Sequence, residues 1–129
     1  MFTENVVITG LCYNMFKPVL DKWESIISNY LKDDYKATIT SANDGSHSTN
    51  SQHYKNKAID IRIKDIDTNL IYRKKILESC VYIIGYYYKD CVFILHLYDG
   101  LNHLHIQKGT ENIINPESGL GENKNVFIK

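Results

Sequence analysis

The chain has 129 residues, a length that suits one globular domain, and we expect that domain to span residues 1–129. Lysine and arginine total 15, as do aspartate and glutamate, so the formal net charge is zero. Without a net positive field, neither nucleic acids nor anionic membranes are expected as partners.

Three cysteines at wide spacings, with no CxxC pair, predict buried thiols rather than a disulfide framework or a thiolate zinc site. The N-terminal residues show neither a basic segment nor an apolar run of signal-peptide length. No stretch of about 18 apolar residues predicts a membrane span. We therefore expect a protein made in the cytoplasm without a signal peptide.

The first half of the chain alternates helical and strand patterns. Apolar residues recur at helical spacing over 14–32, with Pro18 near the start of that predicted helix. Residues 35–41 predict a short strand, and the polar cluster at 42–46 predicts a loop. Residues 57–64 alternate strictly, which predicts a strand with isoleucines facing the core and Asp60 on the other face.

The second half predicts a helix and a hairpin. Residues 68–86 predict a core-packed helix capped by Asp67 or Thr68. Two strands, 91–98 and 102–108, are predicted to join across Asp99-Gly100. The tail at 109–129 is expected to be irregular, although 126–128 could dock. The expected fold is α+β, a small, mostly antiparallel sheet with two helices packed on it.

The histidines suggest a metal site. His103 and His105 are two apart on a predicted strand, so both project from one face. His53 precedes the strand that carries Asp60. If the two strands are neighbours, His53, Asp60 and one of the later histidines can converge on one Zn²⁺ and leave a fourth position for water, as in catalytic zinc sites.

Other interpretations of the histidines remain open. His96 aligns with Val92 and Ile94 on its strand and is interpreted as a packing residue. If the histidines merely decorate the surface, no metal is expected.

Two motifs resemble a known family. The segment SQHYKNKAID, residues 51–60, resembles the SxHxxGxAxD motif of the D-alanyl-D-alanine metallopeptidases and the hedgehog signalling domains, with Asn56 at the usual glycine. His103-Leu104-His105 is similar to the HxH that ends their site. The resemblance covers residues 36–108. It implies that zinc is bound by His53, Asp60 and His105 in a hedgehog-like peptidase fold.

The resemblance also suggests catalytic residues, with departures. The arginine that many family peptidases carry after the first strand is replaced by Ala42-Asn43-Asp44. His47 matches a histidine of the hedgehog-type arrangement and could donate to an oxyanion, or could be a solvated loop residue. Bacterial members often place an acid at the position of Asn102, whose amide cannot shuttle protons. Asp99 is the alternative base.

Asp99 lies six residues before His105, where hedgehog-like relatives place a glutamate, and is either a general base or a turn residue. His103 is expected near the open side of the metal without being a ligand.

The resemblance implies a zinc peptidase acting on a peptide of bacterial peptidoglycan, either a D,D-carboxypeptidase or an L-alanyl-D-glutamate endopeptidase. The lack of a signal peptide suits a phage lysis enzyme or a virion component. The alternative is a zinc-binding structural or interaction module without turnover, of the hedgehog type. The replaced arginine and the displaced carboxylate favour that alternative.

Overall fold

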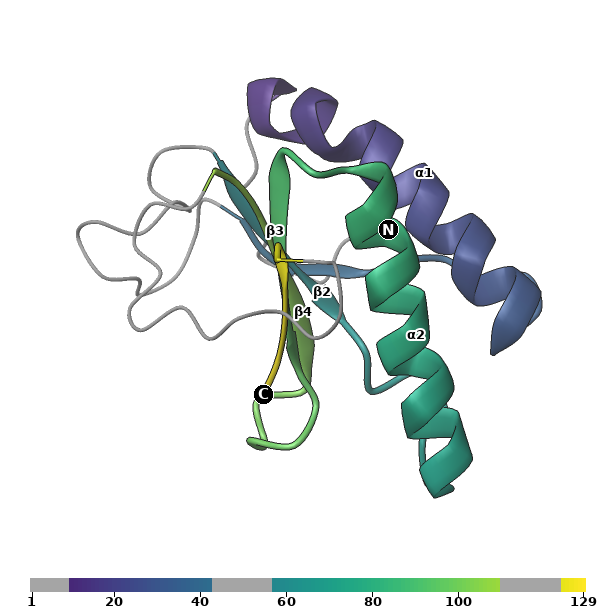
Figure 1. Cartoon of the computed structure of the whole chain (residues 1–129). Coiled ribbons are helices and arrows are strands. Elements are labelled where there is room, and N and C mark those ends of the chain that lie inside the picture. The colour runs from purple at the N-terminus through teal and green to yellow at the C-terminus, as the bar shows by residue number, and fades with distance from the viewer. Residues whose placement is uncertain (1–9, 43–56, 110–123) are drawn as a thin grey trace.

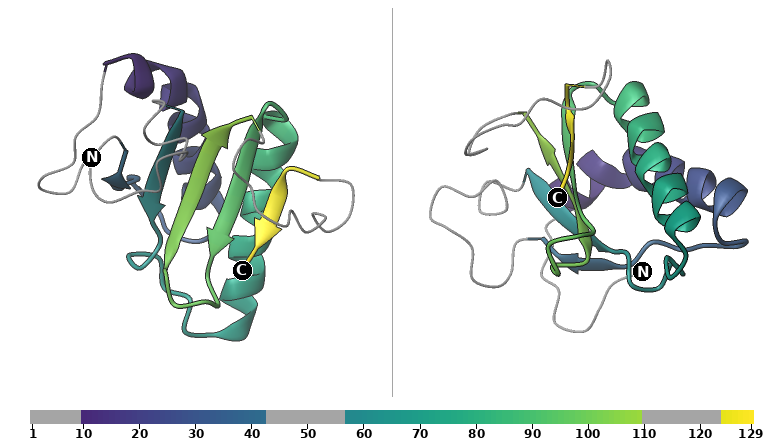
Figure 2. Two further views of the ribbon diagram at one scale, coloured as in Figure 1. Left: turned by 90° about the vertical axis from the view of Figure 1, so that its left-hand side faces the viewer. Right: turned by 60° about the horizontal axis from the view of Figure 1, so that its bottom comes forward.

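The architecture follows from two amphipathic helices and one twisted sheet. The computed structural model describes residues 10–42, 57–109 and 124–129. Both helices, α1 (Gly10–Tyr30) and α2 (Ile71–Tyr87), lie on the same side of the sheet, and the views in Figures 1 and 2 agree on this arrangement. The α+β class predicted from the sequence is confirmed.

The described residues form a five-stranded sheet in the order β1-β2-β4-β3-β5. Its strands are β1 (Ile39–Ser41), β2 (Ala58–Arg62), β3 (Cys91–His96), β4 (His103–Lys108) and β5 (Val126–Ile128). Neighbours run antiparallel except β3 and β5, which are parallel, so the sheet is mixed. Within the tail predicted to be irregular, 126–128 therefore docks as an edge strand.

The core lies between the helices and one face of the sheet. Alternate residues of the central strands point toward the helices and are fully buried, because side chains alternate across a strand with period two. These sheet residues are Ile59, Ile61, Phe93, Leu95, Leu104 and Ile106. From α1, Phe16, Trp23 and Ile27 fill the same space. The alternation predicted for β2 and β4 is confirmed.

Two details of the helices differ from the sequence prediction. The first helix begins at Gly10, so Pro18 lies well inside it rather than near its start. Proline cannot donate to the carbonyl of Asn14, and the helix tolerates this loss because its apolar face is packed on the core. The Pro18 carbonyl accepts a hydrogen bond of 3.1 Å from the Tyr88 hydroxyl of the segment after α2.

The second helix begins at Ile71, later than predicted. Within the described residues, no side chain caps its N-terminus, where Leu70 stands. Asp67 instead accepts the Asn69 N–H at 3.0 Å, which closes a turn before the helix. Ile71 is exposed rather than part of the apolar stripe, which is formed by Leu77, Val81 and Ile84.

The hairpin between β3 and β4 is confirmed, with a longer connection than a two-residue turn. Residues 97–102 join the strands, and both Gly100 and Asn102 adopt positive φ, 87° and 53°. Asparagine tolerates this left-handed conformation, so Asn102 serves the turn. None of the helices in the described residues is long and apolar enough to cross a lipid bilayer.

Candidate functional site

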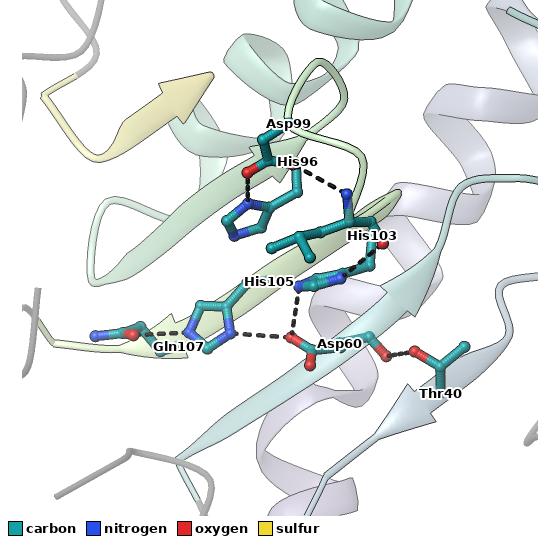
Figure 3. A network of polar contacts seen from close by, with 8 residues as sticks. Thr40, Asp60, His96, Asp99, His103, His105 and Gln107 are labelled. Atoms are coloured by element: carbon teal, nitrogen blue, oxygen red, sulfur yellow. Dashed lines mark hydrogen bonds and ion pairs between the residues drawn. The ribbon is translucent and has the colours of Figure 1, made fainter. Parts of the chain in front are cut away.

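The candidate site lies on the face of the sheet opposite the two helices (Figure 3). Asp60 on β2 is the register partner of His105 on β4, and His103 is the partner of Arg62. Directly opposed residues of an antiparallel pair project from the same face, so the adjacency of β2 and β4 brings Asp60, His103 and His105 together. We call these three residues and Gln107 the Asp60 cluster.

The closest contact in the cluster joins Asp60 and His105. The Asp60 Oδ1 and His105 Nδ1 atoms are 2.9 Å apart, and the two side chains are only 13% and 15% exposed. Ligand atoms bound at about 2.0–2.2 Å to one tetrahedral zinc ion lie about 3.3 Å from each other. A small rotation of either side chain would therefore let both bind one ion.

Gln107 determines which nitrogen of His105 carries a proton. Its side-chain amide nitrogen donates to the Gly109 carbonyl at 3.0 Å, which turns its Oε1 atom toward His105 Nε2 at 2.7 Å. An amide oxygen only accepts, so His105 Nε2 is protonated. In the neutral ring, Nδ1 then presents a lone pair to Asp60. Two such electron-rich atoms at 2.9 Å need a proton or a metal ion between them.

His103 faces the same carboxylate less closely, with its Nε2 atom 3.7 Å from Asp60 Oδ1. Burial lowers the pKa of His103, and this effect outweighs the opposing charge of Asp60, while His96 lowers the pKa further. The neutral ring donates from Nδ1 to the Leu101 carbonyl at 3.3 Å, which leaves a lone pair on Nε2. His103 thus places a second imidazole ring beside Asp60, and burial favours the neutral form of that ring.

The metal prediction extends beyond the described residues. Within 10–42, 57–109 and 124–129, no group of three or more histidine, cysteine, aspartate or glutamate side chains is arranged to hold a metal ion. His53, the predicted third ligand, and His47 lie outside those ranges. The described part of the site brings together two of the three predicted ligands, Asp60 and His105, and their donor atoms suit zinc.

Asp99 lies in the connection between β3 and β4 and combines two functions. Its Oδ1 accepts the Leu101 N–H at 3.1 Å, which stabilises the turn, and its Oδ2 lies 2.6 Å from His96 Nδ1. Desolvation raises the pKa of the Asp99 carboxyl, but the hydrogen bonds from His96 and Leu101 outweigh it, and the pKa lies below its ordinary value. Asp99 therefore stabilises the turn, and it also contacts His96, which the turn conformation does not require.

His96 and Gln107 are site residues that no motif in the sequence predicts. His96 was predicted to pack beside Val92 and Ile94, but its ring bonds to Asp99 and contacts the His103 ring in a tilted arrangement, with ring centroids 4.7 Å apart. The three-residue separation of His96 and Asp99 across a predicted turn could have indicated that the two side chains lie close together. Gln107 follows His105 by two residues and therefore shares its strand face.

Comparison with known proteins adds no further evidence for a function. No protein-family model, curated protein or solved structure matches this chain. A functional assignment therefore rests on the motifs in the sequence and on the chemistry of the Asp60 cluster.

Proposed function

We propose that the chain is a zinc-dependent peptidase that hydrolyses a peptide bond of bacterial peptidoglycan, as a D,D-carboxypeptidase or an L-alanyl-D-glutamate endopeptidase. The observation that carries the proposal is the contact between Asp60 Oδ1 and His105 Nδ1 at 2.9 Å, with the other nitrogen of His105 bonded to Gln107. A histidine that binds a metal through one nitrogen characteristically donates from the other to a fixed acceptor.

In this proposal His53, Asp60 and His105 hold the zinc ion. The motif at residues 51–60 supplies His53 and Asp60, and the HxH segment supplies His105. When bound, zinc supplies a Lewis acid that polarises the scissile carbonyl and lowers the pKa of a water molecule. Gln107 orients the His105 ring for this role, and the β2–β4 ladder holds Asp60 opposite it.

The remaining residues handle protons and charge. The Asp99–His96 pair supplies the proton-accepting group beside the cluster, because it lies on the same sheet face and the His96 ring contacts His103. The neutral imidazole of His103 adds a polar side chain next to Asp60. His47 is proposed to donate to the oxyanion that forms at the scissile carbonyl.

The substrate class follows from the resemblance of the two motifs to the D-alanyl-D-alanine metallopeptidases. We further propose that the enzyme is encoded by a phage and either reaches the cell wall during lysis or is carried in the virion. Neither a nucleic acid nor a membrane is part of the proposed reaction.

Zinc content and hydrolysis test the proposal together. Elemental analysis of the purified protein should give one zinc per chain, and peptidoglycan fragments should be cleaved only without chelator. Asp60→Asn should lose both properties. Asp90→Asn is the matched control, since Asp90 is likewise a carboxylate bonded to a β4 side chain, that of Lys108, but lies at the far end of the hairpin. Wild-type protein without zinc would refute the proposal.

A second candidate is the zinc-binding module without turnover. The observation that favours it is Asn102, which has positive φ in the turn and stands where bacterial family members often place an acid. In the same assay this candidate predicts one zinc per chain and no cleavage of any fragment.

A further inference from the structure

The contact between Asp99 and His96 is short and directional. At 2.6 Å between Oδ2 and Nδ1, it is shorter than an ordinary N–H···O bond, as expected when the acceptor is a charged carboxylate. The His96 side chain is 16% exposed and the Asp99 side chain 34%, so the bond is partly shielded from water.

The Asp99 carboxylate is itself held in place. Its Oδ1 atom accepts the Leu101 N–H at 3.1 Å. The backbone N–H groups of Tyr98 and Asp99 donate to the Lys129 carbonyl, at 2.8 and 3.1 Å, so the segment that follows β5 anchors the turn. A fixed carboxylate can orient a histidine ring.

The bond determines the tautomer of His96. A carboxylate oxygen accepts, so Nδ1 of the ring carries the proton and Nε2 of the neutral ring carries a lone pair. Figure 3 shows the ring of His96 between Asp99 and the Asp60 cluster, with Nδ1 turned to Asp99 and the other nitrogen directed away from it. A carboxylate that orients an imidazole for proton transfer is a recurrent catalytic arrangement on unrelated folds.

We propose that His96, oriented by Asp99, is the group that transfers protons at this site; the inference rests on the peptidase function proposed above. His96 Nε2 takes a proton from the attacking water as its oxygen bonds to the scissile carbonyl carbon. The imidazolium then gives that proton to the amine nitrogen as the C–N bond breaks. Asp99 stays ionised and stabilises the imidazolium.

Asp99 is less suited to take the proton itself. Each of its oxygens already accepts a hydrogen bond, and its lowered pKa makes it a weaker base than an ordinary aspartate. Histidine is the side chain most often used for general acid–base catalysis. The two-residue arrangement also gives Asp99 a function beyond the turn.

The tautomer can be measured without zinc or substrate. In ¹⁵N-detected imidazole spectra of the metal-free protein, His96 should be protonated at Nδ1. In Asp99→Ala this preference should be lost, whereas the matched control Asp90→Ala should leave it unchanged. A wild-type His96 protonated at Nε2 alone would overturn the inference, whatever the activity of the enzyme.

The kinetic test uses His96→Gln in the zinc-loaded protein. We expect kcat to fall by about 10²–10⁴-fold with KM and zinc content unchanged. His96→Gln/Asp99→Asn should be little worse than either single variant, because the two residues act as one unit. Melting temperatures establish that each variant is folded.

The outcomes separate the two proposals. Wild-type cleavage with an unchanged kcat in His96→Gln overturns the role of His96 and leaves the peptidase function standing. A wild-type protein that binds zinc and cleaves no fragment overturns the peptidase function, and proton transfer by His96 falls with it.

Discussion

Two carboxylate–imidazole pairs lie on the same face of the sheet and are held in different ways. Asp60 and His105 are 45 residues apart in the chain and meet because β2 pairs with β4. Asp99 and His96 are three residues apart and meet within one connection between strands. The Asp60 carboxylate is 13% exposed, and that of Asp99 is 34% exposed.

The difference shows which pair depends on the whole fold. A slip of one residue between β2 and β4 would turn His105 to the helix side of the sheet and separate it from Asp60. The Asp99–His96 pair would survive that slip, because it needs only the connection between β3 and β4 and the anchoring of that connection by Lys129, neither of which involves β2. A metal site that includes Asp60 can therefore form only when β2 and β4 pair in the correct register. The Asp99–His96 pair does not depend on that register.

The largest effect is expected when the long-range pair is broken. His105→Ala removes a proposed zinc ligand and should reduce zinc from one per chain to none, because ligands lost from a three-residue site are not replaced by the cysteines, which are buried. His96→Ala is the matched control and should retain full zinc. Stoichiometric zinc in His105→Ala, measured by elemental analysis, would show that the ligand assignment is wrong.

The local pair is tested by Asp99→Asn, which keeps the turn conformation and removes the ionised carboxylate. Activity should fall by about 10²–10⁴-fold, with zinc content and melting temperature unchanged, because His96 loses the carboxylate that orients it for proton transfer and stabilises its charged form. Kinetics on peptidoglycan fragments provide the measurement. Turnover equal to that of the wild type would restrict Asp99 to the turn.

The fold elements could be predicted from the sequence wherever one residue pattern dominated. The alternation around Asp60 predicted β2, and the helical spacing over 14–32 predicted α1, because burial on one face imposes these periods. The start of α1 at Gly10 and the strand β5 were harder to predict. Both depend on packing partners that are distant in the sequence.

The site residues that belong to a sequence motif could be predicted. Those whose role depends only on side-chain geometry could not. Asp60 and His105 were paired in advance from their motifs, and the register of β2 and β4 places them opposite each other. The role of Gln107 follows only from the rotation of its amide toward Gly109. His96 was assigned to packing because its strand neighbours are apolar, and periodicity does not report a hydrogen bond made through a turn.

A substitution at Leu104 tests the stability of the sheet without removing any side chain of the site. It lies between His103 and His105 on β4 but points to the helices and is fully buried. Leu104→Ala should lower the free energy of unfolding by about 2–5 kcal/mol through lost burial and a cavity. Zinc content at saturating metal should remain at one per chain. A loss under about 1 kcal/mol in urea titrations would contradict the packing of β4 on the helices.

Gln107 tests whether ring orientation contributes to metal binding. Gln107→Leu removes the acceptor for His105 Nε2 while keeping similar volume. Zinc affinity should fall by about 10–100-fold, the usual effect of removing a hydrogen-bond partner of a ligating histidine. Competition with a chromogenic chelator measures the affinity. Lys108→Met, altered at the next position of the strand, is the control and should keep wild-type affinity.

The smallest effect concerns a carboxylate–ammonium pair, at the opposite end of the hairpin. Lys108 Nζ on β4 and Asp90 Oδ2 are 2.7 Å apart, and the Asp90 side chain is 66% exposed. The hydrogen bond from Lys108 lowers the pKa of Asp90, and burial raises it in part. Burial lowers the pKa of Lys108, but the hydrogen bond to Asp90 and the interactions with Cys91 and the Asp90 charge together outweigh this effect, so that pKa is raised.

Solvent screening limits the contribution of this pair to at most about 1 kcal/mol, and Lys108→Met should destabilise the protein by no more than that at neutral pH. A carboxyl with a lowered pKa loses its contribution as the pH falls below about 4, and an ammonium with a raised pKa loses its contribution as the pH rises above about 10. The difference in unfolding free energy between the wild type and Lys108→Met should therefore be constant between these limits and shrink beyond either. A double-mutant cycle with Asp90→Asn, measured by urea unfolding across this pH range, isolates the coupling free energy between Lys108 and Asp90. A coupling above about 2 kcal/mol would show that this pair is shielded from solvent, as the Asp60–His105 contact is.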